Sequence, residues 1–322
     1  MKNFKQKTIV HTALVKRKVD VILDFILNKN EWKCFFKRIS VFVIVGILTT
    51  IFWIFPFSIF VAPFYSSVTS SLKPIQKDYL LEGKTTVMSI QNAIQNLLDK
   101  GLVTNFIGVR NWIDNKQNEQ IGEIEIYRIA INTLENNLGR NSGTGGANKN
   151  LTQARADIYA DCERAYFTSY STRLKQTILS IGRYLDELKD NQNILMSNKK
   201  AVFIVNSDNL AEVLDKVKQQ IQTNLATDTS FFTEDDKFYK IRGNLIATYY
   251  FLNGINFDFK DKMIDKSSYK ENFIPILKYL EKAILYNPII VSEFMGDVSK
   301  IEKNANIISQ KLTELRDKLR NG

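Results

Sequence analysis

Twenty-four consecutive residues near the start of the chain, from Ile39 to Ala62, carry no charge and consist mostly of Ile, Val, Leu and Phe. A helix of about 20 apolar residues covers the roughly 30 Å hydrocarbon core of a bilayer and satisfies its own backbone hydrogen bonds there. A cleaved signal peptide is one alternative, but its apolar core is only about 7 to 15 residues long. A buried core helix is another, but such helices rarely exclude every charge over this length. The run therefore predicts a transmembrane helix at residues 39–62.

The residues before this run are strongly basic. Residues 1–38 hold ten Lys and Arg side chains against three acids, a net charge of +7 out of +10 for the 322-residue chain. Basic flanks stay on the cytoplasmic side of a single-pass helix. The sequence therefore predicts a membrane protein with a cytoplasmic N-terminus and a C-terminal domain on the far side of the membrane, which in a Gram-negative bacterium is the periplasm. Because most of the positive charge serves this orientation, it does not indicate nucleic-acid binding.

Four regions follow from this division. Residues 1–38 form a basic cytoplasmic leader, whose stretch from Thr8 to Leu27 is amphipathic. Two interpretations fit that stretch: a helix lying on the anionic cytoplasmic lipid surface, or a short cytoplasmic helix that only enforces orientation. After the membrane helix, residues 63–84 form an exit segment, and residues 85–322 form the extracytoplasmic domain. The Gly-rich segment at 139–150 lacks the Gly-Lys-Ser/Thr ending of a phosphate-binding loop and is expected to be a surface loop.

Apolar residues at steps of three and four predict that the domain is helical. The expected helices cover residues 85–100, 121–138, 151–188, 209–225, 274–286 and 301–319, with a further helix that starts after Thr233–Asp236 and runs through Leu252. Ser207 and Asp208 are candidate caps of the helix at 209–225. We interpret the apolar run at 201–205 as the approach to that helix and not as a strand, because no alternating partner follows.

Narrow apolar seams with heptad spacing run along several of these helices, most regularly over 301–319. Such seams pack either against one another in one chain or against other copies, and the spacing alone fits both. We expect the intramolecular arrangement, because the chain has enough helices of similar length to cover every seam. The expected fold is all-α, with a single N-terminal transmembrane helix followed by a multi-helix bundle.

The residues for common catalytic and metal sites are scarce. His11 is the sole histidine, and Cys34 and Cys162 are expected on opposite sides of the membrane, so we expect no catalytic, cofactor or metal site. Three acid pairs remain as candidates for acid–base chemistry: Asp161 with Glu163, Asp186 with Glu187, and Asp235 with Asp236. All three lie in hydrophilic stretches, where solvated helix surface is the better interpretation. Several aromatics at helical spacing, among them Tyr170, Tyr239, Tyr249, Tyr250 and Phe251, are expected to fill the core.

Five segments resemble an uncharacterised family of bacterial inner-membrane proteins, catalogued as domain of unknown function 2333: TTVMSIQNAIQNLLDKG (85–101), GVRNWIDN (108–115), SDNLAEVLDKV (207–217), DKFYKIRGNLIATYYFLNGINFDFKDKM (236–263) and LTELRDKLRNG (312–322). The resemblance implies an N-terminal anchor and a helical periplasmic domain, and it implies no reaction. Within FYKIRG, Gly243 suggests a close approach of two helices. Arg242 is expected either to pair with Asp258 or Asp261 or to be solvated.

We therefore expect a non-enzymatic, membrane-anchored envelope protein that acts as a scaffold or interaction protein. Its expected partners are the lipid bilayer and another protein, or a second copy bound through the helical seams. The alternative is a binding module that holds a lipid or cell-wall ligand between helices. A hydrolase that uses paired carboxylates is a third class, and it would require two acids facing each other about 5 to 9.5 Å apart.

Overall fold

The computed structural model of the chain describes residues 43–46, 81–102, 110–140, 146–160, 169–190, 201–227, 234–288, 291 and 296–321. The chain divides into two compact units, Met1–Ser66 and Ser67–Gly322. In the first unit, residues 43–46 are helical and exposed. The leader at 1–38, the remainder of the apolar run at 39–62, and both cysteines lie outside the described residues. No helix among the described residues combines the length and apolarity needed to cross a membrane.

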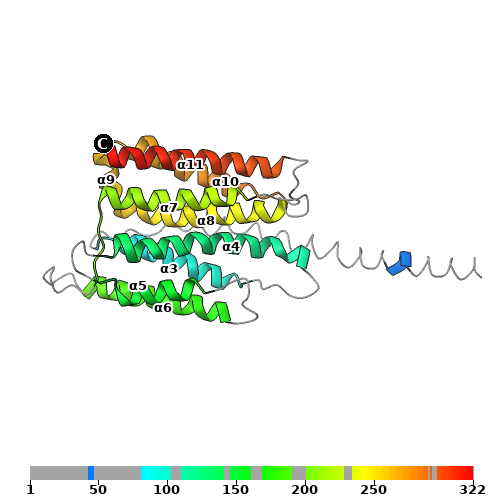
Figure 1. Cartoon of the computed structure of the whole chain (residues 1–322), viewed down its shortest axis with the longest axis horizontal. Coiled ribbons are helices and arrows are strands. Elements are labelled where there is room, and N and C mark those ends of the chain that lie inside the picture. The colour runs from blue at the N-terminus through cyan, green and yellow to red at the C-terminus, as the bar shows by residue number, and fades with distance from the viewer. Residues whose placement is uncertain are drawn as a thin grey trace, which may run out of the picture. The chain divides into compact units, whose positions relative to one another are not determined.

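All regular elements described in the second unit are helices. The bounds are α3 Lys84–Asp99, α4 Arg110–Thr133, the π-helical turn η2 Leu134–Leu138, α5 Lys149–Ile158, α6 Ser169–Asp190, α7 Ser207–Leu225, α8 Glu234–Asp258, α9 Lys260–Asp265, the π-helical turn η5 Tyr269–Phe273, α10 Ile274–Leu285 and α11 Asp297–Asn321. The long helices run alongside one another as a bundle (Figure 1). The described part of this unit is therefore the expected multi-helix bundle.

Helix α8 lies at the centre of this bundle. It packs against α3, α4, α7, α10 and α11, while α5 and α6 pack on each other and α6 also packs on α3 (Figure 1). All residues from Ile241 to Leu252 are buried. The spacing predicted one apolar face for this helix, but neighbours surround it on every side. A helix without a solvent face is typical of the core of a large bundle.

The regular seams of α7 and α11 meet inside the chain. The seam residues of α11 are at most 1% exposed, and those of α7 are buried as far as Ile221. The two helices are neighbours, and full burial of each Leu or Ile contributes about 1.5 to 3 kcal/mol. The prediction that the seams cover one another within the chain is confirmed for this pair.

Two predicted boundaries were wrong. The expected helix at 151–188 is two helices, α5 and α6, which pack together: the Tyr170 hydroxyl donates to the Ile158 carbonyl at 3.1 Å, and Arg173 pairs with Asp157 at 2.9 Å. Helix α4 begins at Arg110 rather than near Ile121. Its first turns bury Gln117, Glu119 and Gln120, so apolar spacing could not reveal them.

The segment at 201–206 is neither strand nor helix. It packs along the bundle: the Tyr184 hydroxyl donates to the Val202 carbonyl at 2.5 Å, and the Ile204 amide donates to the Leu138 carbonyl at 2.7 Å. Helix α7 begins directly after it. The cap is Asn206, whose side chain accepts from the Asn209 amide at 2.7 Å, and not Ser207 or Asp208 as expected.

Replacing Asn206 with Ala should lower the free energy of unfolding by about 1 kcal/mol, because the Asn209 amide loses its acceptor. Urea unfolding of the full chain in a mild detergent, followed by circular dichroism, measures the difference. Ser207→Ala is the matched control and should change stability by less than about 0.5 kcal/mol. A larger loss for Ser207→Ala than for Asn206→Ala would contradict this assignment of the cap.

Candidate functional site

Helices α4 and α8 approach each other closely at two glycines. Gly122 on α4 lies directly against the backbone of Lys240, and Gly243 on α8 lies directly against the carbonyl oxygen of Glu119. A Cβ atom at either glycine would overlap the facing backbone. The prediction of close helix approach at Gly243 is therefore confirmed, and its partner helix is α4.

Arg242, the residue before this glycine, is buried in the same contact. Its side chain is 1% exposed and forms an ion pair with Glu119, which is also buried. Its Nη2 donates to the Ile284 carbonyl of α10 at 3.2 Å. Its Nε atom has no hydrogen-bond partner among the described residues. One guanidinium thus joins α8 to both α4 and α10.

Arg242 does not pair with the acids expected from the sequence. Asp258 lies 16 residues further along the same helix, which is about 24 Å at 1.5 Å per residue. Its carboxylate instead accepts from the amide and hydroxyl of Thr86, at 2.7 and 2.6 Å, at the start of α3. Asp261 is exposed on α9. The interpretation of Arg242 as solvated was also wrong.

A second buried acid, Glu123, lies one turn after Glu119 on α4 and is 3% exposed. It accepts a hydrogen bond from the Tyr127 hydroxyl at 3.0 Å. Burial raises the pKa of Glu123 to about 7, and the charge of Glu119 adds to this effect against the opposing effects of Lys100, Tyr127 and Arg242. Two buried carboxyl groups thus lie one turn apart on α4, and only Glu119 is paired with the guanidinium of Arg242.

We call Glu119, Glu123, Tyr127 and Arg242 the buried charged cluster. Burial, and next the nearby Glu123, raise the pKa of Tyr127 well above its ordinary value, so its hydroxyl stays a donor. The chemical capacity of this cluster is therefore to bind and release one proton at Glu123. Among the described residues, no group of His, Cys, Asp and Glu side chains is arranged to hold a metal ion.

Beside this cluster, a second polar network joins α4, α7 and α8 through Glu125. Its carboxylate accepts from Lys240 at 2.8 Å, Asn224 at 2.7 Å and Gln220 at 2.9 Å. Asn244, which is fully buried, donates to the Gly122 carbonyl at 2.8 Å and accepts from Asn224 at 2.8 Å. Hydrogen bonds that bridge three helices hold α4 and α8 in one register.

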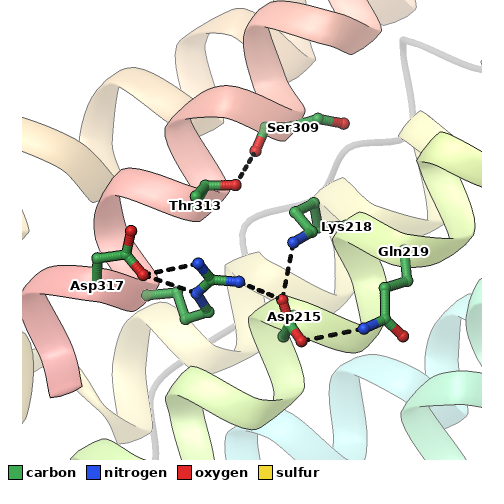
Figure 2. A network of polar contacts seen from close by, with 7 residues as sticks. Asp215, Lys218, Gln219, Ser309, Thr313 and Asp317 are labelled. Carbon is green, nitrogen blue, oxygen red and sulfur yellow. Dashed lines mark hydrogen bonds and ion pairs between the residues drawn. The ribbon is translucent and has the colours of Figure 1, made fainter.

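Figure 2 shows the polar contacts between α7 and α11, whose side chains are partly exposed, Arg316 to 19% and Asp215 to 22%. Asp215 accepts from Lys218 at 2.9 Å, Gln219 at 3.0 Å and Arg316 at 2.6 Å, and Arg316 also pairs with Asp317 at 2.7 Å. Partial burial acts to raise the pKa of Asp215, but the hydrogen bonds from Lys218 and Arg316 outweigh it and leave this pKa below its ordinary value. This network fixes how the two seams align.

The acid pairs expected from the sequence do not form such a cluster. Asp186 is exposed and pairs with Lys189 at 3.0 Å, and Glu187 accepts from the Asn148 side chain at 2.7 Å. Asp236 accepts from Asn118 at 2.6 Å, while Asp161 and Glu163 lie outside the described residues. Of the described acids only Asp186 is fully on the surface, as its hydrophilic context predicted, while Glu187, Asp235 and Asp236 are partly buried. Tyr170, Tyr239, Tyr249, Tyr250 and Phe251 are buried in the core, also as predicted.

The sequence analysis missed Glu119 and Glu123. Their spacing of four residues places both on one face of a helix, and apolar residues follow each acid from Glu123 to Ile126. That spacing was a signal, but it does not distinguish a buried acidic face from a solvated one. The distinction requires knowing which face of α4 meets α8.

Comparison with protein-family models matches residues 27–228 to a family described as an uncharacterised protein conserved in bacteria, DUF2333. The match takes in the whole apolar run at 39–62 and the helices from α3 to α7. It ends before two of the segments on which the resemblance was based, 236–263 and 312–322. The comparisons with curated proteins and with solved structures gave no match.

Proposed function

The chain belongs to the DUF2333 family of uncharacterised bacterial proteins, and from this premise we propose that it is a membrane-anchored, non-enzymatic envelope protein. Its helical bundle acts as a scaffold or docking surface for another membrane or envelope component. The observation that carries this proposal is the uncharged run from Ile39 to Ala62, followed by a bundle built from long helices. A single family match covers both the run and the first part of the bundle.

The proposed orientation rests on charge. The net +7 of residues 1–38 favours retention of this flank in the cytoplasm, and the opposite flank then leads into a periplasmic domain. The first long helix described after the apolar run, α3, begins at Lys84, 22 residues after Ala62.

A scaffold role is supported by how the bundle uses its polar residues. The ion pair of Arg242 and the Glu125 network hold the central helices together without forming a described catalytic or metal centre. The α7 and α11 seams are covered within the chain. A docked protein, or a second copy, therefore contacts the outer faces of the bundle and not these seams.

Membrane extraction tests the anchor. We expect the full chain to stay in the bilayer after carbonate extraction, whereas Leu48→Arg with Phe52→Arg shifts it to the soluble fraction. Each Arg at the centre of a span costs about 2.5 to 3.5 kcal/mol on insertion scales. Leu48→Val with Phe52→Leu is the matched control and stays in the membrane. Extraction of the unmodified chain by carbonate would contradict the anchor.

Affinity purification tests the scaffold role. The tagged full chain is cross-linked in cells, solubilised in detergent and analysed by size-exclusion chromatography and mass spectrometry. The proposal expects one envelope protein, or a second copy, to copurify in a defined ratio. A strictly monomeric chain with no specific partner would overturn the scaffold role while leaving the anchor intact.

A further inference from the structure

The buried charged cluster has a charge imbalance that the ion pair does not remove. Glu119 already neutralises Arg242, and Glu123 lies one turn away in the same contact. If Glu123 loses its proton, the contact holds two carboxylates and one guanidinium. A buried charge without its own partner is costly, because protein surroundings replace water poorly.

Other charged and polar groups act on Glu123 as well, and together they do not offset the effect of its burial. Lys100, at the end of α3, favours the charged form of Glu123, as do Arg242 on α8 and the Tyr127 hydroxyl on α4. These effects are smaller than the effect of burial. Tyr250 on α8 contributes to the raised pKa of Tyr127. Helix α10 contributes the Ile284 carbonyl, which accepts a hydrogen bond from Arg242.

The close packing of α4 against α8 limits how this contact can respond when Glu123 ionises. Gly122 and Gly243 place the two backbones against each other, and Gly243 faces the backbone of both Glu119 and Glu123. The α4 backbone is also tied to α8 by the hydrogen bond from Asn244 to the Gly122 carbonyl. Hydration of an ionised Glu123 through this face therefore requires α4 and α8 to separate locally.

We propose that the α4–α8 contact is a proton-sensitive switch, in which protonated Glu123 keeps the two helices together and its deprotonation favours their local separation. This inference goes beyond the proposed scaffold role and does not depend on it. In a periplasmic domain, the switch would respond to the pH outside the cytoplasm, and it would alter the shape of the surface presented to a partner.

The direction of the pH effect follows from the two states. In the separated state Glu123 has its ordinary pKa of 4.5, and in the closed state burial raises this pKa to about 7. Below pH 4.5 the acid is protonated in both states, and the closed state has its full stability. Between pH 4.5 and 7 separation becomes easier as pH rises, and above pH 7 the effect levels off.

Hydrogen–deuterium exchange of the full chain in a mild detergent tests the switch, after correction for the intrinsic pH dependence of exchange. For amides of α4 and α8 around the cluster, the opening constant should rise on the order of 100-fold between pH 5 and pH 8. Amides of α5 and α6 should not change in parallel. In Glu123→Gln, which resembles the protonated acid, the rise should fall below about threefold.

Two further variants keep the test decisive if Glu123→Gln folds poorly. Tyr127→Phe removes a hydrogen bond that favours the charged form, so the transition should move to higher pH. Glu281→Gln is the matched control: its carboxylate also accepts from a tyrosine, Tyr249 at 3.0 Å, but it is exposed. This control should show the same pH dependence as the unmodified chain.

Three results would overturn the switch. The first is an unmodified chain with no pH-dependent opening around the cluster. The second is a rise that persists in Glu123→Gln or a transition that does not move in Tyr127→Phe. The third is an equal rise in α5 and α6, which would mean that the whole bundle unfolds instead of the α4–α8 contact opening.

Discussion

Replacing Arg242 with Met should lower the free energy of unfolding by about 3 to 5 kcal/mol. The Met side chain approximates the length of the Arg stem but leaves Glu119 buried beside Glu123 without a positive partner. The Ile284 carbonyl also loses a donor. Guanidinium unfolding of the full chain in detergent, followed by circular dichroism, measures the loss.

Two controls separate the buried pair from a general effect of losing an arginine. Arg183→Met, on the exposed face of α6, should change stability by less than about 0.5 kcal/mol. Glu119→Met combined with Arg242→Met should recover most of the loss, because replacing both members of a buried pair with apolar groups is often neutral. A double variant as unstable as Arg242→Met alone would show that the pair is not the source of the loss.

Replacing Gly243 with Ala should destabilise the chain by at least about 2 kcal/mol, although Ala is the better helix former by about 1 kcal/mol. The added methyl group overlaps the backbone carbonyl of Glu119. Backbone atoms cannot turn aside as a side chain can, so α4 and α8 must move apart. Thermal unfolding followed by circular dichroism should show a lower midpoint for this variant.

Gly182→Ala on α6 is the matched control for this prediction. An added Cβ there would lie 3.1 Å from the end of the flexible Gln91 side chain. That side chain can move, so the substitution should be neutral or stabilise the chain by up to about 1 kcal/mol. Equal effects of Gly182→Ala and Gly243→Ala would mean that helix propensity, and not close approach, decides the outcome at Gly243.

Much of the bundle was predictable because its outer helices have one apolar face each. Helix α11 is an example: Ile301, Ala305, Ile308 and Leu312 follow steps of four, three and four, and all are buried. Gly101 was also a reliable end signal for α3, since its φ of 75° is a conformation that glycine adopts at no steric cost. Local spacing and local backbone preferences are properties of the sequence, so these features required no knowledge of neighbours.

The interior polar residues were not predictable in the same way. The sequence identified Gly243 as a site of close approach. For Arg242, however, it predicted either a pair with Asp258 or Asp261, which are near in sequence, or exposure to solvent. Its partner, Glu119, lies 123 residues earlier. An ion pair of this kind depends on which helices become neighbours, and helix periodicity carries no information about that choice.

The uncharged run from Ile39 to Ala62 and the charge that precedes it predict an anchor and an orientation from residue type and order alone, because transfer into lipid depends on these properties. The seams of the outer helices were likewise determined by spacing. Only the tertiary structure decided that α8 is surrounded, that Gly122 and Gly243 bring two backbones together, and that Arg242 pairs with Glu119 while Glu123 is buried one turn away. Burial and the pKa of an acid depend on the atoms packed around it, and those atoms come from distant parts of the chain.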